Sequence, residues 1–392
     1  VGTVLQGSLR RSGSRVRVMA QLVSTSDGSH LWRDRYDLEL VDVLQFEEQL
    51  ASSIAGQLRV EFGGGDRRPA PRVANADAHT AYLEGRYYFA RGTPEALVQA
   101  MACYQRAVAL DPGSALAYDS LGELYWYLGF FGNVPPRDAF TQSTWHAMRA
   151  LELDDTLAQT HALLGMLRKE LDYNWPEVER EMRRALQLNR ESPVVRLRNA
   201  LSWIMPLGRP GEALAEIEGI IQTDPLNLLH RWWAAIMAWL ARRPDRAIGE
   251  ARHIIALDPT HFLGHHVLGT ALTETGALPE AVAALEKAYE LSGGVPAVQG
   301  FLAYALGRAG RREEALALIA RAEAAAVSSY VPPSTMAFGY VGLGDWDAAL
   351  QWWDKAIDAR DPIVIPIKSY AFFAPLRGDP RFRAMLAKMH LA

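Results

Sequence analysis

The sequence holds a single cysteine, Cys103, in 392 residues, so an internal disulfide framework is excluded. It also lacks any apolar run of the roughly 18–20 residues that a membrane-spanning helix requires. Neither charge dominates, because 45 Asp and Glu stand against 41 Lys and Arg, for a net charge of −4. No global basic field is therefore present to attract nucleic acid or anionic lipid. The composition, 49% hydrophobic and 22% charged, is typical of soluble globular proteins.

Sequence signatures of catalysis are missing as well. The phosphate-binding motifs GxGxxG and GxxxxGK[ST] and the nucleophile motif GxSxG do not occur. The lone triplet Gly63–Gly65 follows a predicted helix and is interpreted as linker. Asp154 and Asp155 fall in a predicted loop, where they cap a helix end, and Cys103 is interpreted as a small buried side chain. We expect no catalytic residue and no cofactor, so any enzyme activity would belong to an upstream domain of a parent protein.

An internal repeat organises most of the chain. Six-residue loops of the type AVALDP, at 107–112, recur along the chain. The fifth residues of these loops are Asp111, Asp154, Asn189, Asp224, Asp258, Ser292 and Arg360. Successive members of this series are 43, 35, 35, 34, 34 and 68 residues apart. The segment FFGNVPPRD at 130–138 accounts for the longer first step. A helical period of 34 residues predicts tetratricopeptide repeats, which stack into a right-handed superhelical solenoid with a concave groove.

Eight helix–turn–helix units are predicted, at 77–112, 114–155, 156–190, 192–225, 226–259, 260–293, 294–327 and 328–361. The two helices of a unit must approach closely, and small residues recur where they touch, such as Gly269, Ala281 and Ala288 in the sixth unit. Turns such as GTPEA and GRPGEA place proline at the start of the second helix, where its missing N–H costs no bond. The non-repeating segment 362–392 is predicted to be a C-terminal cap.

Three histidines lie within six positions, at His261, His265 and His266, and raise the alternative of a metal site. No cysteine lies nearby and no HExxH motif is present, whereas structural zinc needs three or four ligands. Asp258–Pro259 is instead the joint between two units, with Thr260 as the expected N-cap of the next helix. We therefore interpret these histidines as ordinary helix residues, with His266 on the concave side, and expect no metal ligand in this chain.

Residues 1–62 have a different pattern. Runs at 4–11, 15–23 and 30–36 predict a three-stranded antiparallel meander, with Val18, Ala20 and Leu22 alternating toward one face. The run at 41–58 has helical spacing. We predict a small, truncated α+β unit at 1–62 and a flexible linker at 63–76, followed by a mostly α-helical array at 77–361.

The run LQGSLRRSGSRVRVMAQLVSTSDGSHLWRDRY resembles the TolB-like (FlgO-related) region of bacterial signalling proteins, and the resemblance continues through TPEALVQAMACYQRAVALDP to FAPLRGDPRFRAML. In that family the region precedes a tetratricopeptide array and follows a class III adenylate or guanylate cyclase domain or a winged-helix DNA-binding domain. The resemblance implies a regulatory C-terminal region and transfers no catalytic residue. The strand and helix that usually precede this run are absent, so we expect a parent protein upstream of Val1.

A protein-binding groove is the remaining functional prediction. The first helix of each unit lines the groove, and aromatic and arginine side chains, which dominate binding hot spots, recur there. The predicted groove residues are Tyr82, Arg86, Phe89, Trp126, Tyr127, Arg198, Trp232, Trp239, His266, Tyr304 and Phe338. The alternative, left open for Trp232 and Trp239, is that these rings only fill a tight superhelix.

The partner expected for this groove is a protein or peptide. We predict a non-catalytic interaction and scaffolding region that contacts no nucleic acid and contains no membrane segment. The expected parent is a class III adenylate or guanylate cyclase. The alternatives are the sensory region of a winged-helix transcriptional regulator and a free-standing structural adaptor that forms homo-oligomers. A cytoplasmic location is favoured, and a periplasmic one follows if a membrane helix precedes Val1.

Overall fold

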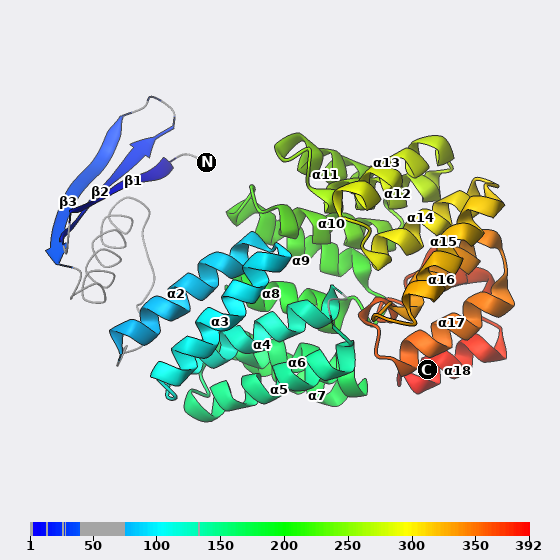
Figure 1. The fold of residues 1–392 in the computed structure, drawn as a ribbon, viewed down its shortest axis with the longest axis horizontal. Helices are drawn as coiled ribbons and strands as arrows, with labels where there is room; N and C mark the ends of the chain where they lie inside the picture. The colour runs from blue at the N-terminus through cyan, green and yellow to red at the C-terminus, as the bar shows by residue number, and fades with distance from the viewer. Residues whose placement is uncertain (1–2, 13–14, 26, 28, 40–74, 132–133) are drawn as a thin grey trace.

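The computed structural model describes the chain except for residues 1–2, 13–14, 26, 28, 40–74 and 132–133. The helix predicted at 41–58 and nearly all of the predicted linker at 63–76 therefore lie outside the described residues. The divisions predicted at these positions stay predictions. Figure 1 shows a small sheet followed by an array of paired helices.

The sheet is the predicted meander. Strands β1 (Thr3–Ser12), β2 (Arg15–Ser24) and β3 (His30–Glu39) pair antiparallel in the order β1-β2-β3. Val18, Ala20 and Leu22 are buried on one face of the central strand, as the alternation predicts. The register between β2 and β3 shifts between Leu22 and Val23.

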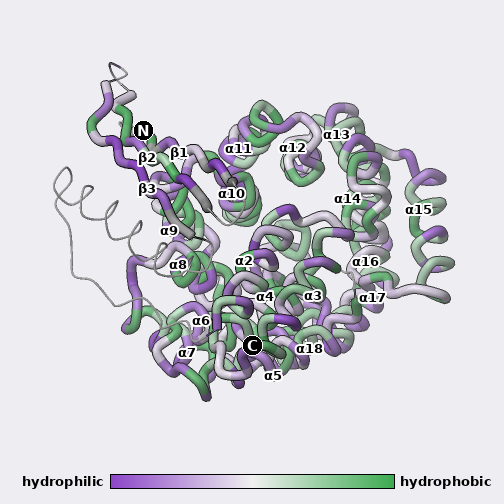
Figure 2. Tube along the Cα trace, turned by 60° about the vertical axis from the view of Figure 1, so that its left-hand side comes forward, coloured by the Kyte–Doolittle hydropathy of each residue, from purple (hydrophilic) through white to green (hydrophobic). Residues whose placement is uncertain are grey.

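Eight helical hairpins follow in the described part of the chain, and they confirm the tetratricopeptide solenoid. The pairs are α2 (Ala76–Arg91) with α3 (Pro94–Leu110), α4 (Ala115–Phe130) with α5 (Pro136–Leu153), α6 (Ala158–Asp172) with α7 (Trp175–Leu188), α8 (Pro193–Asn199) and η2 (Ala200–Ile204) with α9 (Pro210–Thr223), α10 (Leu228–Leu240) with α11 (Pro244–Leu257), α12 (Phe262–Thr275) with α13 (Leu278–Leu291), α14 (Pro296–Arg308) with α15 (Arg312–Ala325), and α16 (Pro333–Leu343) with α17 (Trp346–Asp358). The C-terminal segment adds η3 (Pro362–Val364), η4 (Ala371–Leu376) and α18 (Pro380–Lys388). Figure 2 shows apolar and hydrophilic positions alternating along the helices of the array.

The hairpin turns follow the local chemistry that the sequence predicts. Pro94, Pro210 and Pro244 each begin the second helix of a pair. Gly276 ends α12 in the left-handed region at φ 84°, which a glycine adopts without strain. The N-cap of α12 is His261 and not Thr260 as predicted. Thr260 instead lies in the preceding turn, where its N–H and hydroxyl both donate to Asp258 Oδ1.

Small residues set the distance between paired helices. Ala281 and Ala288 of α13 are fully buried, and Gly269 of α12 packs directly onto α13. A Cβ atom on Gly269 would lie 2.5 Å from Leu285 Cγ and 2.8 Å from the carbonyl oxygen of Ala281. A larger residue would therefore force the two helices apart.

The C-terminal segment reaches across the array to the third hairpin. The indole N–H of Trp175 donates to the carbonyl oxygen of Met389 at 2.8 Å. The eighth hairpin also contacts this unit, since the Tyr173 hydroxyl donates to the carbonyl oxygen of Ile357 in α17 at 3.2 Å. The Arg360 guanidinium lies 4.3 Å from the centre of the Tyr173 ring. One buried core runs from α6 to the last residues of the chain, so the solenoid closes on itself.

Candidate functional site

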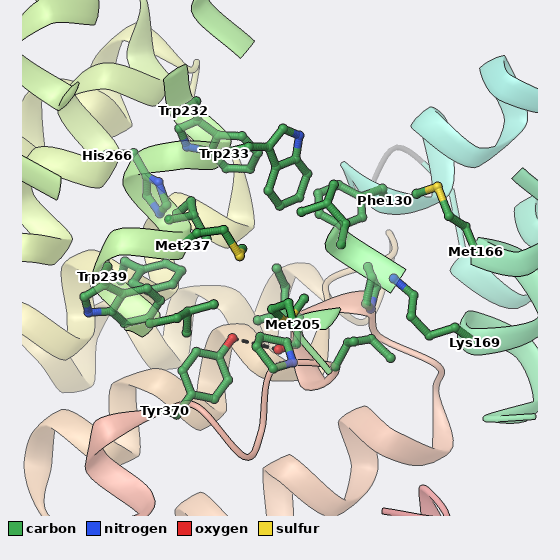
Figure 3. Close-up of a pocket in the computed structure, with 18 of the residues that line it drawn as sticks. Phe130, Met166, Lys169, Met205, Trp232, Trp233, Met237, Trp239, His266 and Tyr370 are labelled. Atoms are coloured by element: carbon green, nitrogen blue, oxygen red, sulfur yellow. Dashed lines mark hydrogen bonds between the residues drawn. The ribbon is translucent and has the colours of Figure 1, made fainter. Parts of the chain in front are cut away.

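The C-terminal segment covers the inner side of the array. The Tyr370 ring lies 5.6 Å from the Trp239 ring of α10 and 5.8 Å from the Phe338 ring of α16. Its hydroxyl donates to the carbonyl oxygen of Ile363 at 2.7 Å, the dashed line in Figure 3. Phe372 adds a ring contact to Tyr304 of α14 at 6.1 Å. Side chains of first helices that a groove would expose are therefore packed against the chain's own tail.

Six of the predicted groove residues are buried, including Trp232 and Trp239, for which packing was the alternative. They are Arg198, Trp232, Trp239, His266, Tyr304 and Phe338. The Tyr304 hydroxyl donates to Glu274 at 2.7 Å, and the His266 ring packs edge-on against Phe301 at 4.7 Å. Burial lowers the pKa of His266 to about 4, so its imidazole is neutral at physiological pH. These side chains are buried in the described fold. Their role in partner binding stays a prediction.

The other predicted residues lie at the amino-terminal end of the array and are half-buried or exposed. Tyr82, Arg86 and Phe89 share one face of α2, with the Arg86 guanidinium 5.9 Å from the centre of the Tyr82 ring. Phe89 packs edge-on against Tyr127 of α4 at 5.5 Å. Trp126, the remaining predicted residue, stacks on Phe130 at 5.1 Å. We call Tyr82, Arg86, Phe89 and Tyr127 the amino-terminal face.

A buried polar network joins α4, on which Tyr127 lies, to α6 and α8. The Arg198 guanidinium donates to Glu123 at 2.6 Å and to the carbonyl oxygen of Gln159 at 2.7 Å. Asp119 accepts a hydrogen bond from the Thr160 hydroxyl at 2.7 Å. Burial raises the pKa of Asp119 to about 6, although the nearby Arg198 charge opposes the shift. The network fixes the positions of α4, α6 and α8 relative to one another.

Two adjoining cavities open inside the ring of helices. The inner cavity, of about 80 Å³, is lined by Trp126, Met166, Lys169, Met205, Trp233, Met237 and Tyr370 among others. The outer cavity, of about 230 Å³, lies between the α2–α3 turn, the end of α4 and the starts of α12 and α14. Both are lined by Phe130, Trp232, His266, Phe301 and Ile363. Figure 3 shows Trp232, Trp233 and His266 on one side of the inner cavity, and Phe130 and Lys169 on the other.

Several residues of this region are not among the predicted groove residues. Lys169 and Glu170 are both buried, with the ammonium 2.9 Å from the carboxylate, in a helix that carries no distinguishing motif. Burial raises the pKa of Glu170, while the Lys169 charge opposes the shift. Ile363 and Tyr370 belong to the non-repeating tail. The apolar residues of IVIPI and SYAFF are the feature of the sequence that indicates a buried tail.

The described residues show little other chemistry. Among them, no group of three or more His, Cys, Asp and Glu side chains is placed to hold a metal ion. The His265 imidazole Nε2 lies 2.9 Å from the carbonyl oxygen of Pro259, within the inter-repeat joint. Burial raises the pKa of the half-buried Cys103, which disfavours the reactive thiolate. None of the described helices combines the length and apolarity needed to cross a bilayer.

The chain is similar to parts of two bacterial regulatory proteins. A Rhizobium meliloti (strain 1021) protein assigned as adenylate cyclase 3 is 29% identical over 167 residues, which are 42% of this chain and 28% of that protein. The transcriptional regulator HilA of Salmonella typhimurium is 28% identical over 102 residues, which are 26% of this chain and 18% of the regulator. The matched part thus spans less than a third of either relative. No family model matches the chain.

Among solved structures, the human IFIT1 dimer with PPP-AAAA superposes with a TM-score of 0.54 at 14% identity, over 82% of this chain and 78% of that one. At this identity the likeness shows the fold alone. It agrees with the helical solenoid predicted from the 34-residue period. The TolB-like resemblance of residues 1–62 stays a prediction.

Proposed function

We propose that this chain is a non-catalytic interaction and regulatory region of a larger bacterial signalling protein, and that it binds a protein or peptide partner through the amino-terminal face. The observation that carries the proposal is the division of the array. The inner side of the later units is filled by the tail around Tyr370, whereas the rings and the guanidinium of the first two units stay accessible.

The amino-terminal face has the composition of a binding hot spot. Tyr82, Arg86 and Phe89 lie on one side of α2, and Tyr127 extends the surface onto α4. Tyrosine and arginine are enriched among residues that contribute most to protein interfaces. Tyr127 also lines the outer cavity, which gives an apolar side chain of a bound peptide a place to enter. A short peptide with one large apolar residue fits this arrangement.

Nucleic acid is a weaker candidate, although PPP-AAAA is bound in the human IFIT1 structure. Binding a phosphate chain requires several unpaired cations. Lys169 is the one Lys or Arg side chain among the described residues that line the two cavities, and it is paired with Glu170. We therefore do not extend that ligand to this chain.

For the parent protein, we propose a class III adenylate or guanylate cyclase, supported by the similarity to the Rhizobium meliloti protein. The similarity to HilA supports a second candidate, a winged-helix transcriptional regulator. In either case these residues would carry a signal to an effector domain. Both assignments rest on partial matches, and a free-standing adaptor or self-assembly module is the third candidate.

The first experiment is to read the coding DNA upstream of the Val1 codon. A cyclase domain there leads to an assay of cyclase activity with and without residues 1–392, and a change in activity supports the regulatory role. A winged-helix domain supports the second candidate, and a start codon directly before Val1 contradicts both.

Arg86→Ala and Phe89→Ala are then expected to weaken binding to the identified partner about tenfold each. Val327→Ser, at a position that is 88% exposed in the turn after α15, is the matched control.

A further inference from the structure

We propose that the two cavities form one site for a small neutral molecule with a ring-sized apolar body and a hydrogen-bond-accepting oxygen. This site goes beyond the proposed partner binding and does not depend on it. Three features of the molecule support it: the size and walls of the cavities, buried nitrogen atoms without partners, and the charge balance of the lining.

The size and lining suit an apolar body. An apolar cavity of about 150 Å³ inside a protein stays dry and binds benzene. The outer cavity, of about 230 Å³, is larger than this, and the inner cavity adds about 80 Å³ behind their shared wall. That wall contains the rings of Phe130, Trp232 and Phe301. Met166, Met205 and Met237 line the inner cavity, and their flexible side chains can adjust to a ligand.

Three side chains of the lining carry unsatisfied polar atoms. Among the described residues, Trp126 Nε1, Trp232 Nε1 and His266 Nδ1 are buried and have no hydrogen-bond partner. A buried indole N–H without a partner is destabilising, so such groups usually have a partner in the native state. An indole N–H can only donate, and the missing partner is therefore an acceptor. A carbonyl or ether oxygen on a ligand that reaches one of these N–H groups would supply it.

The charge balance selects a neutral ligand. The lining contains one ammonium, that of Lys169, and the Glu170 carboxylate already lies 2.9 Å from it. The His266 imidazole is neutral because burial lowers its pKa to about 4. A ligand carboxylate or ammonium would bring an unbalanced charge into an apolar interior, which is far more costly than burying a neutral group.

The site joins segments that are distant in sequence. Its walls come from α4, α6, α10, α12, α14 and the C-terminal segment, including Ile363 and Tyr370. A ligand bound there would contact the tail and the array at once. It would bind the folded chain and not the unfolded one, so it would raise the unfolding temperature with concentration.

The test uses three probes of similar size on the full chain: acetophenone, ethylbenzene and benzoate. Ligand-observed NMR and the unfolding temperature report binding. We expect saturable binding of acetophenone, about fivefold weaker binding of ethylbenzene, which lacks the acceptor, and binding of benzoate at least tenfold weaker than that of acetophenone. No saturable binding of either neutral probe would overturn the site, and tighter binding of benzoate would overturn the neutral ligand.

Two variants locate the site. Ala297→Trp, at a half-buried position on the wall of the outer cavity, should abolish acetophenone binding. Trp232→Phe keeps a ring but removes one of the two indole N–H groups, and should reduce the difference in affinity between acetophenone and ethylbenzene. Trp352→Phe, outside both cavities, should leave the affinities unchanged. Unaltered binding in Ala297→Trp, with the fold intact by circular dichroism, contradicts the location. The partner-binding proposal shares only Tyr127 with the outer cavity, and Arg86 and Phe89 lie outside both cavities. Failure here therefore leaves the binding test of Arg86→Ala and Phe89→Ala standing.

Discussion

Trp175 and Met389 are 214 residues apart in sequence, yet the indole N–H of the first donates to the carbonyl oxygen of the second at 2.8 Å. Trp175 begins α7 in the third hairpin, and Met389 directly follows α18 at the end of the chain. An open solenoid makes contacts only between neighbouring repeats. In this chain the C-terminal end, at Met389, instead contacts the third unit, at Trp175. Unfolding of the array and release of its tail are therefore coupled.

Trp175→Phe tests this coupling. The change leaves the Met389 carbonyl oxygen without its donor in a buried position, and should lower the free energy of unfolding by about 1–3 kcal/mol. Urea denaturation followed by circular dichroism measures the effect. Trp145→Phe is the control, because Trp145 is 58% exposed and should change stability by less than about 0.5 kcal/mol. Equal losses in the two variants would argue against a stabilising closure.

Two helical glycines have opposite expected responses to alanine. Gly269→Ala brings a methyl group to 2.8 Å from the Ala281 backbone oxygen, which cannot move independently, and should destabilise the chain by about 1–3 kcal/mol. Gly249 lies inside α11 with no atom within 4 Å of the added Cβ. Gly249→Ala should therefore stabilise by about 0.5–1 kcal/mol, because glycine weakens a helix interior. Urea midpoints of both variants decide the matter, and shifts of the same sign would contradict the packing argument.

The repeat could be predicted from sequence because each unit reuses the same local solution. Small residues such as Ala281 recur at fixed spacing where two helices touch, and Pro94 or Pro244 marks the start of a second helix. The alternation of Val18, Ala20 and Leu22 predicts the buried face of the sheet in the same local way. These signals are visible without knowledge of any distant contact.

The filling of the inner side could not be predicted in this way. Counting along the first helices selects Trp239 and Phe338, but it does not show that Tyr370 covers them. The tail has no repeat, and nothing in its own pattern specifies which surface it meets. The prediction of Thr260 as the α12 N-cap was wrong because of a local contact. The Thr260 hydroxyl donates to Asp258 in the preceding turn and does not cap the helix.

Tyr370→Ala is expected to loosen the tail. The ring contacts Trp239, Phe338 and Trp353, and its loss from a buried site should cost about 3–5 kcal/mol of stability. Limited proteolysis should then cut between residues 359 and 379 sooner than in the unmodified chain. Tyr370→Phe removes only the bond to the Ile363 carbonyl oxygen and should cost about 1 kcal/mol. Tyr87→Ala, at a position that is 62% exposed, is the control. Unchanged cleavage in Tyr370→Ala would contradict the covering role.

Asp119 gives the stability of the chain a defined pH dependence. Burial raises its pKa to about 6 in the folded chain, above the ordinary value of 3.8. The folded state therefore binds its proton more tightly than the unfolded state, and this stabilisation is complete below about pH 4 and lost as the pH rises through about 6. Asp119→Asn cannot ionise and can still accept the Thr160 hydrogen bond.

The free energy of unfolding of Asp119→Asn, relative to that of the unmodified chain, should rise by about 2 kcal/mol between pH 4 and pH 7. Urea titrations of both proteins at half-unit pH steps measure this difference, in which the titration of all other groups cancels. A difference that stays flat, or that falls with pH, would show that the Asp119 carboxylate is stabilised in the fold by Arg198 more than it is penalised by burial.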